Sequence, residues 1–117
     1  MNMNLAKAEN FLGAAQMAVR EASKALKADN LAMLTANAEA ALGLFSEVKN
    51  MIVRGEVSAE EIATMIGMPA HALATGEKGL KGLEDLIERT KTENPGALIG
   101  LNPLAEAMRT FLELARG

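Results

Sequence analysis

The sequence predicts an all-α protein, and its composition is the first reason. Alanine and leucine, both strong helix formers, supply 22 and 16 of the 117 residues. Residues that favour β-strands are scarce, because valine and isoleucine together number nine, tryptophan and tyrosine are absent, and the aromatic share is 3%. A domain usually has ~100 to 200 residues. We therefore expect residues 1–117 to form one helical domain.

The second reason is the spacing of apolar residues in the N-terminal half. A first helix is expected from Asn4, its predicted N-cap, with apolar steps of three and four over three heptads. The seam of this helix consists of Leu5, Ala8, Leu12, Ala15, Val19, Ala22 and Leu26. A second helix opens after Asp29 or Asn30 and repeats the pattern at Leu31, Leu34, Ala38, Ala41, Phe45, Val48 and Ile52. Matched seams with a very short connection predict a long antiparallel hairpin over residues 4–54.

The second helix is also apolar outside its seam. Met33, Ala40, Leu44 and Met51 lie off the repeat, and a helix that is apolar nearly all round belongs inside an assembly of helices. We expect it to be covered on two sides. The second cover is either the C-terminal half of this chain or a second copy of it.

Clear helix boundaries follow the hairpin. Gly55 after Arg54 fits a helix end with glycine at C′, and Val57 is placed for the hydrophobic contact of a Schellman motif. Ser58 and Glu61 have the spacing of a capping box, which predicts a new helix there. That helix is expected to be short, because Gly67 and Pro69 follow.

Residues 58–117 are expected to form three or four shorter helices. Three glycines at 76, 79 and 82 indicate either a break in the segment from Pro69 to about Thr92 or close packing against another backbone. We favour the break, with a new helix from Glu77. Residues 94–96 predict a turn and residues 97–101 a short apolar loop. Asn102 is then the expected N-cap and Pro103 the first residue of the last helix.

Several functional classes have no support in the sequence. Cysteine is absent and His71 is the single histidine, so we expect no disulfide, no metal site and no cofactor. No acid, base and nucleophile stand at a recognisable catalytic spacing, which predicts a protein that is not an enzyme. We find neither a secretory leader nor an apolar run of the ~18 residues that a membrane span requires, so we expect no membrane partner and a cytoplasmic location.

One segment resembles a helix-turn-helix DNA-binding motif. In residues 58–76 the small, turn and apolar positions of that motif fall at Ile62-Ala63, Ile66-Gly67 and Leu73. The resemblance implies nucleic-acid contacts from His71, Thr75, Lys78 and Lys81. Charge argues against this role, because no lysine or arginine lies between Arg54 and Lys78 and the net charge of the chain is -3. DNA binding is therefore the alternative hypothesis, and a structural corner is the preferred interpretation.

The leading functional hypothesis is a non-enzymatic interaction or assembly protein. Methionine suits adaptable apolar contacts, and Met17 and Met33 lie off their helical seams, where they form an outer strip with Ala14, Ala40 and Leu44. We predict a homo-oligomer, or a complex with another protein, whose contacts include Met17, Met33, Leu44 and Met51. Opposite net charges in residues 1–28 and 29–57 indicate arms that complement each other or remain solvated. A pocket for an apolar ligand inside the bundle is a further alternative.

Overall fold

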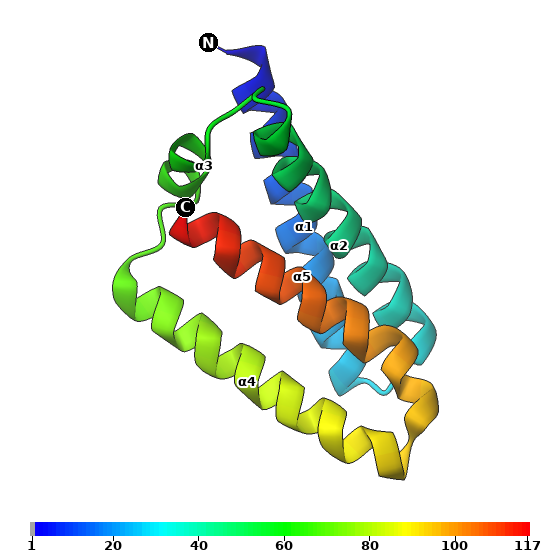
Figure 1. Cartoon of the computed structure of the whole chain (residues 1–117). Helices are drawn as coiled ribbons and strands as arrows, with labels where there is room; N and C mark the ends of the chain where they lie inside the picture. Colours follow the sequence, from blue (N-terminus) through cyan, green and yellow to red (C-terminus); the bar gives the residue numbers. More distant parts are fainter. Residues whose placement is uncertain (1) are drawn as a thin grey trace.

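A computed structural model describes residues 2–117 and confirms the all-α class. These residues form a compact bundle of five α-helices and one short 3-10 helix, without a strand (Figure 1). In chain order the elements are α1 (Met3–Lys27), α2 (Leu31–Val53), α3 (Ala59–Ile66), α4 (Ala70–Glu93), η1 (Pro95–Ala97) and α5 (Leu98–Arg116).

The predicted hairpin is confirmed, with α1 and α2 packed along their length (Figure 1). The fully buried residues of both helices belong to the seams read from the sequence, apart from Ala25 and Met51, which lie beside them. The connection is tight because Asp29 adopts a φ of 59°, a left-handed conformation that aspartate tolerates better than most residues. The side chain of Asn30 accepts a hydrogen bond from the amide of Met33 at 3.1 Å and so caps α2.

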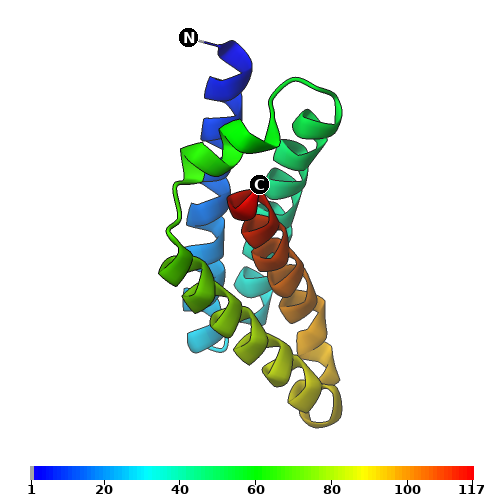
Figure 2. The same ribbon diagram turned by 60° about the vertical axis from the view of Figure 1, so that its left-hand side comes forward.

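The three C-terminal helices lie on one side of the hairpin. Helix α5 packs against α2, α4 packs on α5, and α3 crosses one end of the bundle against α5 and α1 (Figure 2). The second cover that α2 requires is therefore the C-terminal half of the chain itself. The opposite side of the hairpin carries no further helix of residues 2–117.

The interior consists of two neighbouring clusters of apolar side chains. One lies at the end of the bundle where α3 crosses and is built around Leu12, Phe45, Met51 and Ile62. The other lies toward the hairpin turn and includes Leu34, Leu83 and Leu101. Val19 packs against both clusters. The two clusters therefore meet near the middle of α1.

The predicted helix boundaries around residue 55 are confirmed. The amides of Gly55 and Glu56 donate to the carbonyls of Ile52 and Met51, both at 3.0 Å, which is the bonding pattern of a Schellman motif. Gly55 has a φ of 74°, the conformation that favours glycine at this position. Ser58 and Glu61 form the reciprocal capping box, with hydrogen bonds of 3.0 and 2.9 Å.

Substitution of Ser58 by alanine should lower the free energy of unfolding by ~0.5 to 2 kcal/mol, because the amide of Glu61 loses the side-chain oxygen that it bonds. Urea denaturation followed by circular dichroism measures the change. Ser23→Ala is the matched control, since Ser23 is an exposed residue in the interior of α1 and alanine is the better helix former there. Equal stability of the two variants would show that the Ser58 cap contributes nothing.

The N-terminal cap and the middle of the C-terminal half differ from prediction. Asn2, rather than Asn4, caps α1 by accepting from the amide of Asn4 at 2.9 Å. The predicted break near Gly76 is wrong, because α4 runs without interruption for 24 residues and is as long as the hairpin helices. A Cβ atom at Gly76 would lie 2.9 Å from Cδ2 of Leu112. Close packing of α4 on α5 therefore explains this glycine, and it outweighs the ~1 kcal/mol loss of helix propensity.

The start of the last helix is also earlier than predicted. Residues 97–101 are not a loop, because η1 leads directly into α5 at Leu98 and Pro103 lies inside the helix. Asn102 is therefore not an N-cap. Gly100 and Leu101 are buried, and a Cβ atom at Gly100 would lie 2.8 Å from Oγ1 of Thr35. The contact with α2 stabilises an additional turn that the sequence pattern assigned to a loop.

Candidate functional site

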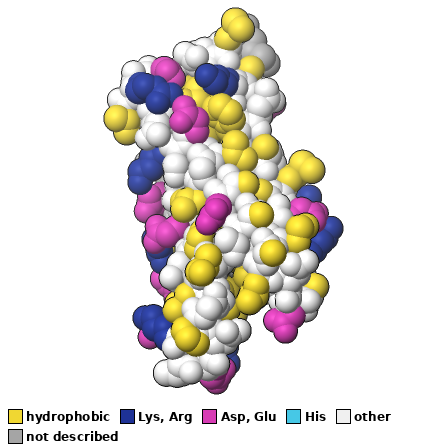
Figure 3. Space-filling model, turned by 90° about the vertical axis from the view of Figure 1, so that its right-hand side faces the viewer, with side chains coloured by type: hydrophobic (Ala, Val, Ile, Leu, Met, Phe, Trp, Pro, Cys, Tyr) yellow, Lys and Arg dark blue, Asp and Glu magenta, His cyan; other side chains and the backbone are white. Residues whose placement is uncertain are grey.

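Among the accessible apolar surfaces of residues 2–117, two are candidate sites, and the first is the outer face of the hairpin. We define the hairpin face as Ala14, Met17, Met33, Ala40 and Leu44. The side chains of Met17 and Met33 are 66% and 48% exposed, Ala14 and Ala40 are exposed, and Leu44 is half-buried. On the side of the molecule where α2 lies, hydrophobic groups run down the middle and most charged groups lie nearer the edges (Figure 3).

The structure separates Met51 from the other residues predicted for self-association. Met51 is completely buried in the core cluster that also contains Phe45 and Ile62. It faces its own chain, where Val57 and α3 complete the cover. A second copy could reach Met51 only if this end of the bundle opened. The surface available for contact therefore contains Met17, Met33 and Leu44, but not Met51.

The four residues proposed for nucleic-acid contact all lie on α4. His71, Thr75, Lys78 and Lys81 are exposed, and the hydroxyl of Thr75 donates to the carbonyl of His71 at 2.9 Å. The two helices of a helix-turn-helix contact each other across a short turn. Here α3 packs on α5 and α1, while α4 packs on α5. DNA binding remains a prediction that gains no support from this arrangement.

Most acidic residues of α4 and α5 form ion pairs at the surface. Arg109 donates to Glu84 at 2.9 Å and also pairs with Glu106, and the hydrogen bond that Glu84 accepts raises the pKa of Arg109. Arg116 pairs with Glu77. Between Asn2 and Gly117, no group of three or more histidine, aspartate or glutamate side chains is placed to hold a metal ion. These carboxylates have the arrangement of a solvated face.

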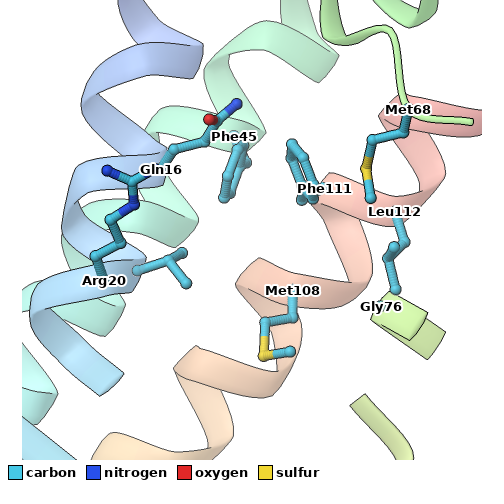
Figure 4. Close-up of a pocket in the computed structure, with 9 residues that line it drawn as sticks. Gln16, Arg20, Phe45, Met68, Gly76, Met108, Phe111 and Leu112 are labelled. Carbon is cyan, nitrogen blue, oxygen red and sulfur yellow. The ribbon is translucent and has the colours of Figure 1, made fainter. Parts of the chain in front are cut away.

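The second accessible apolar surface is a pocket of about 300 Å³ at the junction of the two core clusters. It opens between α1 on one side and α4 and α5 on the other (Figure 4). Its lining is formed by Gln16, Val19, Arg20, Phe45, Met68, Gly76, Met108, Phe111 and Leu112. A pocket of this size lies at the lower end of the ~300 to 1,000 Å³ of small-molecule sites.

The walls of this pocket are aromatic and sulfur-containing, whereas its polar groups come from one helix. The rings of Phe45 and Phe111 lie 5.3 Å apart between centroids, tilted by 44°, and the flexible side chains of Met68 and Met108 extend the apolar wall (Figure 4). Gln16 and Arg20 occupy the opposite side, on α1 (Figure 4). The pocket is therefore an open, largely apolar cleft with polar groups at one edge.

Arg20 differs from most arginines of this chain in its surroundings. Arg54, Arg109 and Arg116 each pair with glutamate. Arg20 is exposed and joins none of the ion pairs formed within residues 2–117. Its guanidinium is available to an anion at the edge of the pocket.

The residues of this pocket could not be identified from the sequence. The sequence places Phe45 in the hairpin seam and Arg20 in the basic segment 1–28, and both placements concern only the hairpin. The pocket forms because the connection 67–69 and the uninterrupted α4 bring Met68 and Gly76 opposite α1. The only signal in the sequence was the number of methionines outside the seams.

Comparison with known proteins gave no match to a family model, to a curated protein or to a solved structure. No helix within residues 2–117 is both long enough and apolar enough to cross a membrane.

Proposed function

We propose that this protein is a non-enzymatic interaction protein that associates with a second copy of itself through the hairpin face. The observation that carries the proposal is the exposure of Met17 and Met33 beside small alanines on the side of the hairpin that no other helix covers. Small residues let helix backbones approach closely, and exposed methionines adapt to a facing surface. Apolar surface that the fold leaves in water favours association.

The size of the hairpin supports a stable contact. Helices of 25 and 23 residues are roughly 35 Å long at ~1.5 Å per residue, and two adjacent helices are about 20 Å wide. The whole outer side of the hairpin, of which the hairpin face is a part, therefore has an outline of roughly 700 Å², close to the ~800 Å² per partner of a standard interface. A flat pairing of two hairpins would use most of this surface.

The charges of the two arms support an arrangement in which α1 of one copy lies on α2 of the other. Residues 1–28 carry a net charge of +2 (four basic, two acidic) and residues 29–57 carry -2 (two basic, four acidic). No ion pair joins α1 to α2 in the part of the chain that the structure describes. A two-fold axis that crosses the arms brings these opposite charges together between copies.

The wild-type protein should therefore have the mass of a dimer at micromolar concentration, measured by light scattering after gel filtration. The variant Ala14→Glu/Ala40→Glu places like charges on the hairpin face and should have the mass of a monomer. Both positions are exposed in helices, so the circular dichroism spectrum of the variant should be unchanged.

The matched control is Ile99→Glu, because Ile99 is 68% exposed on α5 and lies outside the hairpin face. This variant should remain a dimer. A monomeric wild type would contradict self-association. Dissociation by Ile99→Glu, with no effect of the double variant, would place the contact on another surface.

A further inference from the structure

We propose that the pocket between α1, α4 and α5 binds a linear aliphatic carboxylate, with the alkyl chain among Val19, Met108 and Phe111 and the carboxylate at Arg20. This inference is independent of self-association, because Ala14, Met17, Met33, Ala40 and Leu44 do not line the pocket. This pocket combines an apolar lining with a cation, Arg20, at its edge.

The shape and lining of the pocket argue for the alkyl chain. Six of its nine lining residues are valine, phenylalanine, methionine or leucine, and such a surface gains free energy when it is removed from water. Methionine side chains adjust to a flexible chain more easily than branched residues do. The volume of about 300 Å³ equals roughly ten times the ~30 Å³ that a water molecule occupies in the liquid. Because a methylene group has roughly the volume of a water molecule, the pocket suits a chain of about eight to ten carbons.

The position of Arg20, and the absence of an ion-pair partner for it within residues 2–117, argue for a carboxylate on that chain. Its guanidinium can donate two parallel hydrogen bonds to the two oxygens of a carboxylate. No glutamate or aspartate within residues 2–117 forms an ion pair with this guanidinium. Gln16 lies one helical turn away on the same edge of the pocket and supplies an amide donor. A carboxylate at this edge keeps contact with water, while the alkyl chain lies in the apolar part of the pocket.

Binding of sodium octanoate can be followed by NMR on protein labelled with ¹³C at the methionine methyl groups. Met68 and Met108 line the pocket, whereas Met17 and Met33 lie on the hairpin face. We expect saturable shifts of the Met68 and Met108 methyl signals and unchanged Met17 and Met33 signals. Equal shifts at all four methionines would show general association with apolar surface and would overturn the proposal.

A series of chain lengths tests the alkyl part of the proposal in the unaltered protein. Each added methylene should tighten binding about threefold to fourfold from hexanoate to octanoate. The gain should cease near ten carbons, when the pocket is full. An affinity that is independent of chain length would contradict burial of the chain. Because this series uses only the unaltered protein, its result does not depend on whether a substitution perturbs folding.

Substitution at Arg20 tests the carboxylate part. Arg20→Ala should weaken octanoate binding about tenfold and leave the binding of 1-octanol unchanged. Lys27→Ala is the matched control, because Lys27 is an exposed cation of α1 that does not line the pocket and joins no ion pair of residues 2–117. Equal octanoate affinities of these two variants would overturn the assignment of the carboxylate to Arg20.

Two more variants locate the ligand and separate this proposal from the proposed function. Val19→Phe adds bulk to the lining and should abolish the shifts at Met68 and Met108, while the signal of the fully buried Met51 reports that the variant is folded. Ala14→Glu/Ala40→Glu should bind octanoate as the wild type does, because neither residue borders the pocket. Octanoate binding that persists in Val19→Phe would place the ligand elsewhere.

Discussion

Replacement of Phe45 by alanine should lower the free energy of unfolding by about 3 to 5 kcal/mol and the midpoint of thermal unfolding by roughly 10 to 20 °C. The ring of Phe45 is 1% exposed and packs against that of Phe111. The substitution removes this aromatic contact and opens a void between the two core clusters, beside the existing pocket. Such a loss is a large part of the ~5 to 15 kcal/mol that stabilises a domain.

Urea denaturation monitored at 222 nm measures this change. Phe11→Ala is the control, because it makes the same chemical change at a half-buried residue of α1 that packs at the edge of the same cluster. The loss should be clearly smaller for Phe11→Ala. If the two variants lose equal stability, Phe45 does not occupy the central position that the structure gives it.

Substitution of Gly100 by leucine should destabilise the protein by about 1 to 3 kcal/mol or more, although leucine is the better helix former. A Cβ atom at this position would lie 2.8 Å from Oγ1 of Thr35 and 2.9 Å from Cγ of Leu34. Leu34 is fully buried in the core cluster that also contains Leu83 and Leu101. The additional side chain therefore pushes α5 away from α2.

Gly82→Leu is the matched comparison on α4. No heavy atom beyond the local backbone lies within 4 Å of a Cβ atom built at Gly82, and the residue is exposed. Its replacement should raise stability by up to about 1 kcal/mol, because a glycine in a helix interior is unfavourable. The two variants should therefore shift the urea midpoint in opposite directions. A shift in the same direction would contradict the close approach of α5 to α2 at Gly100.

The hairpin and its boundaries could be predicted because local rules act on them without competition. The seam residues Leu12, Leu34 and Phe45 are buried as the repeat of three and four requires. Ser58 and Glu61 form their capping box from residues three apart, so no distant contact is needed. Where the local signal and the packing agree, the sequence is sufficient to predict the helix and its boundaries.

The C-terminal half could be predicted only in part because packing opposes the local signals there. Gly76 weakens a helix by its intrinsic propensity, yet α4 continues through it, and a Cβ atom there would lie 2.9 Å from Cδ2 of Leu112 on α5. Pro103 usually marks a helix start, yet the fit of Gly100 against α2 begins α5 five residues earlier. Gly76 therefore indicated a break in the sequence but lies in close contact with α5 in the structure.

The sequence by itself determined the helical class, the antiparallel hairpin and the accessible residues of its outer face, because helix propensity and periodicity are properties of neighbouring residues. Only the tertiary structure decided that α5 covers α2 and that Met51 lies inside the core. It also decided that Arg20 borders a pocket shared with Met68, Met108 and Phe111. These outcomes depend on which distant helix faces meet, and residue spacing along one helix carries no information about that choice.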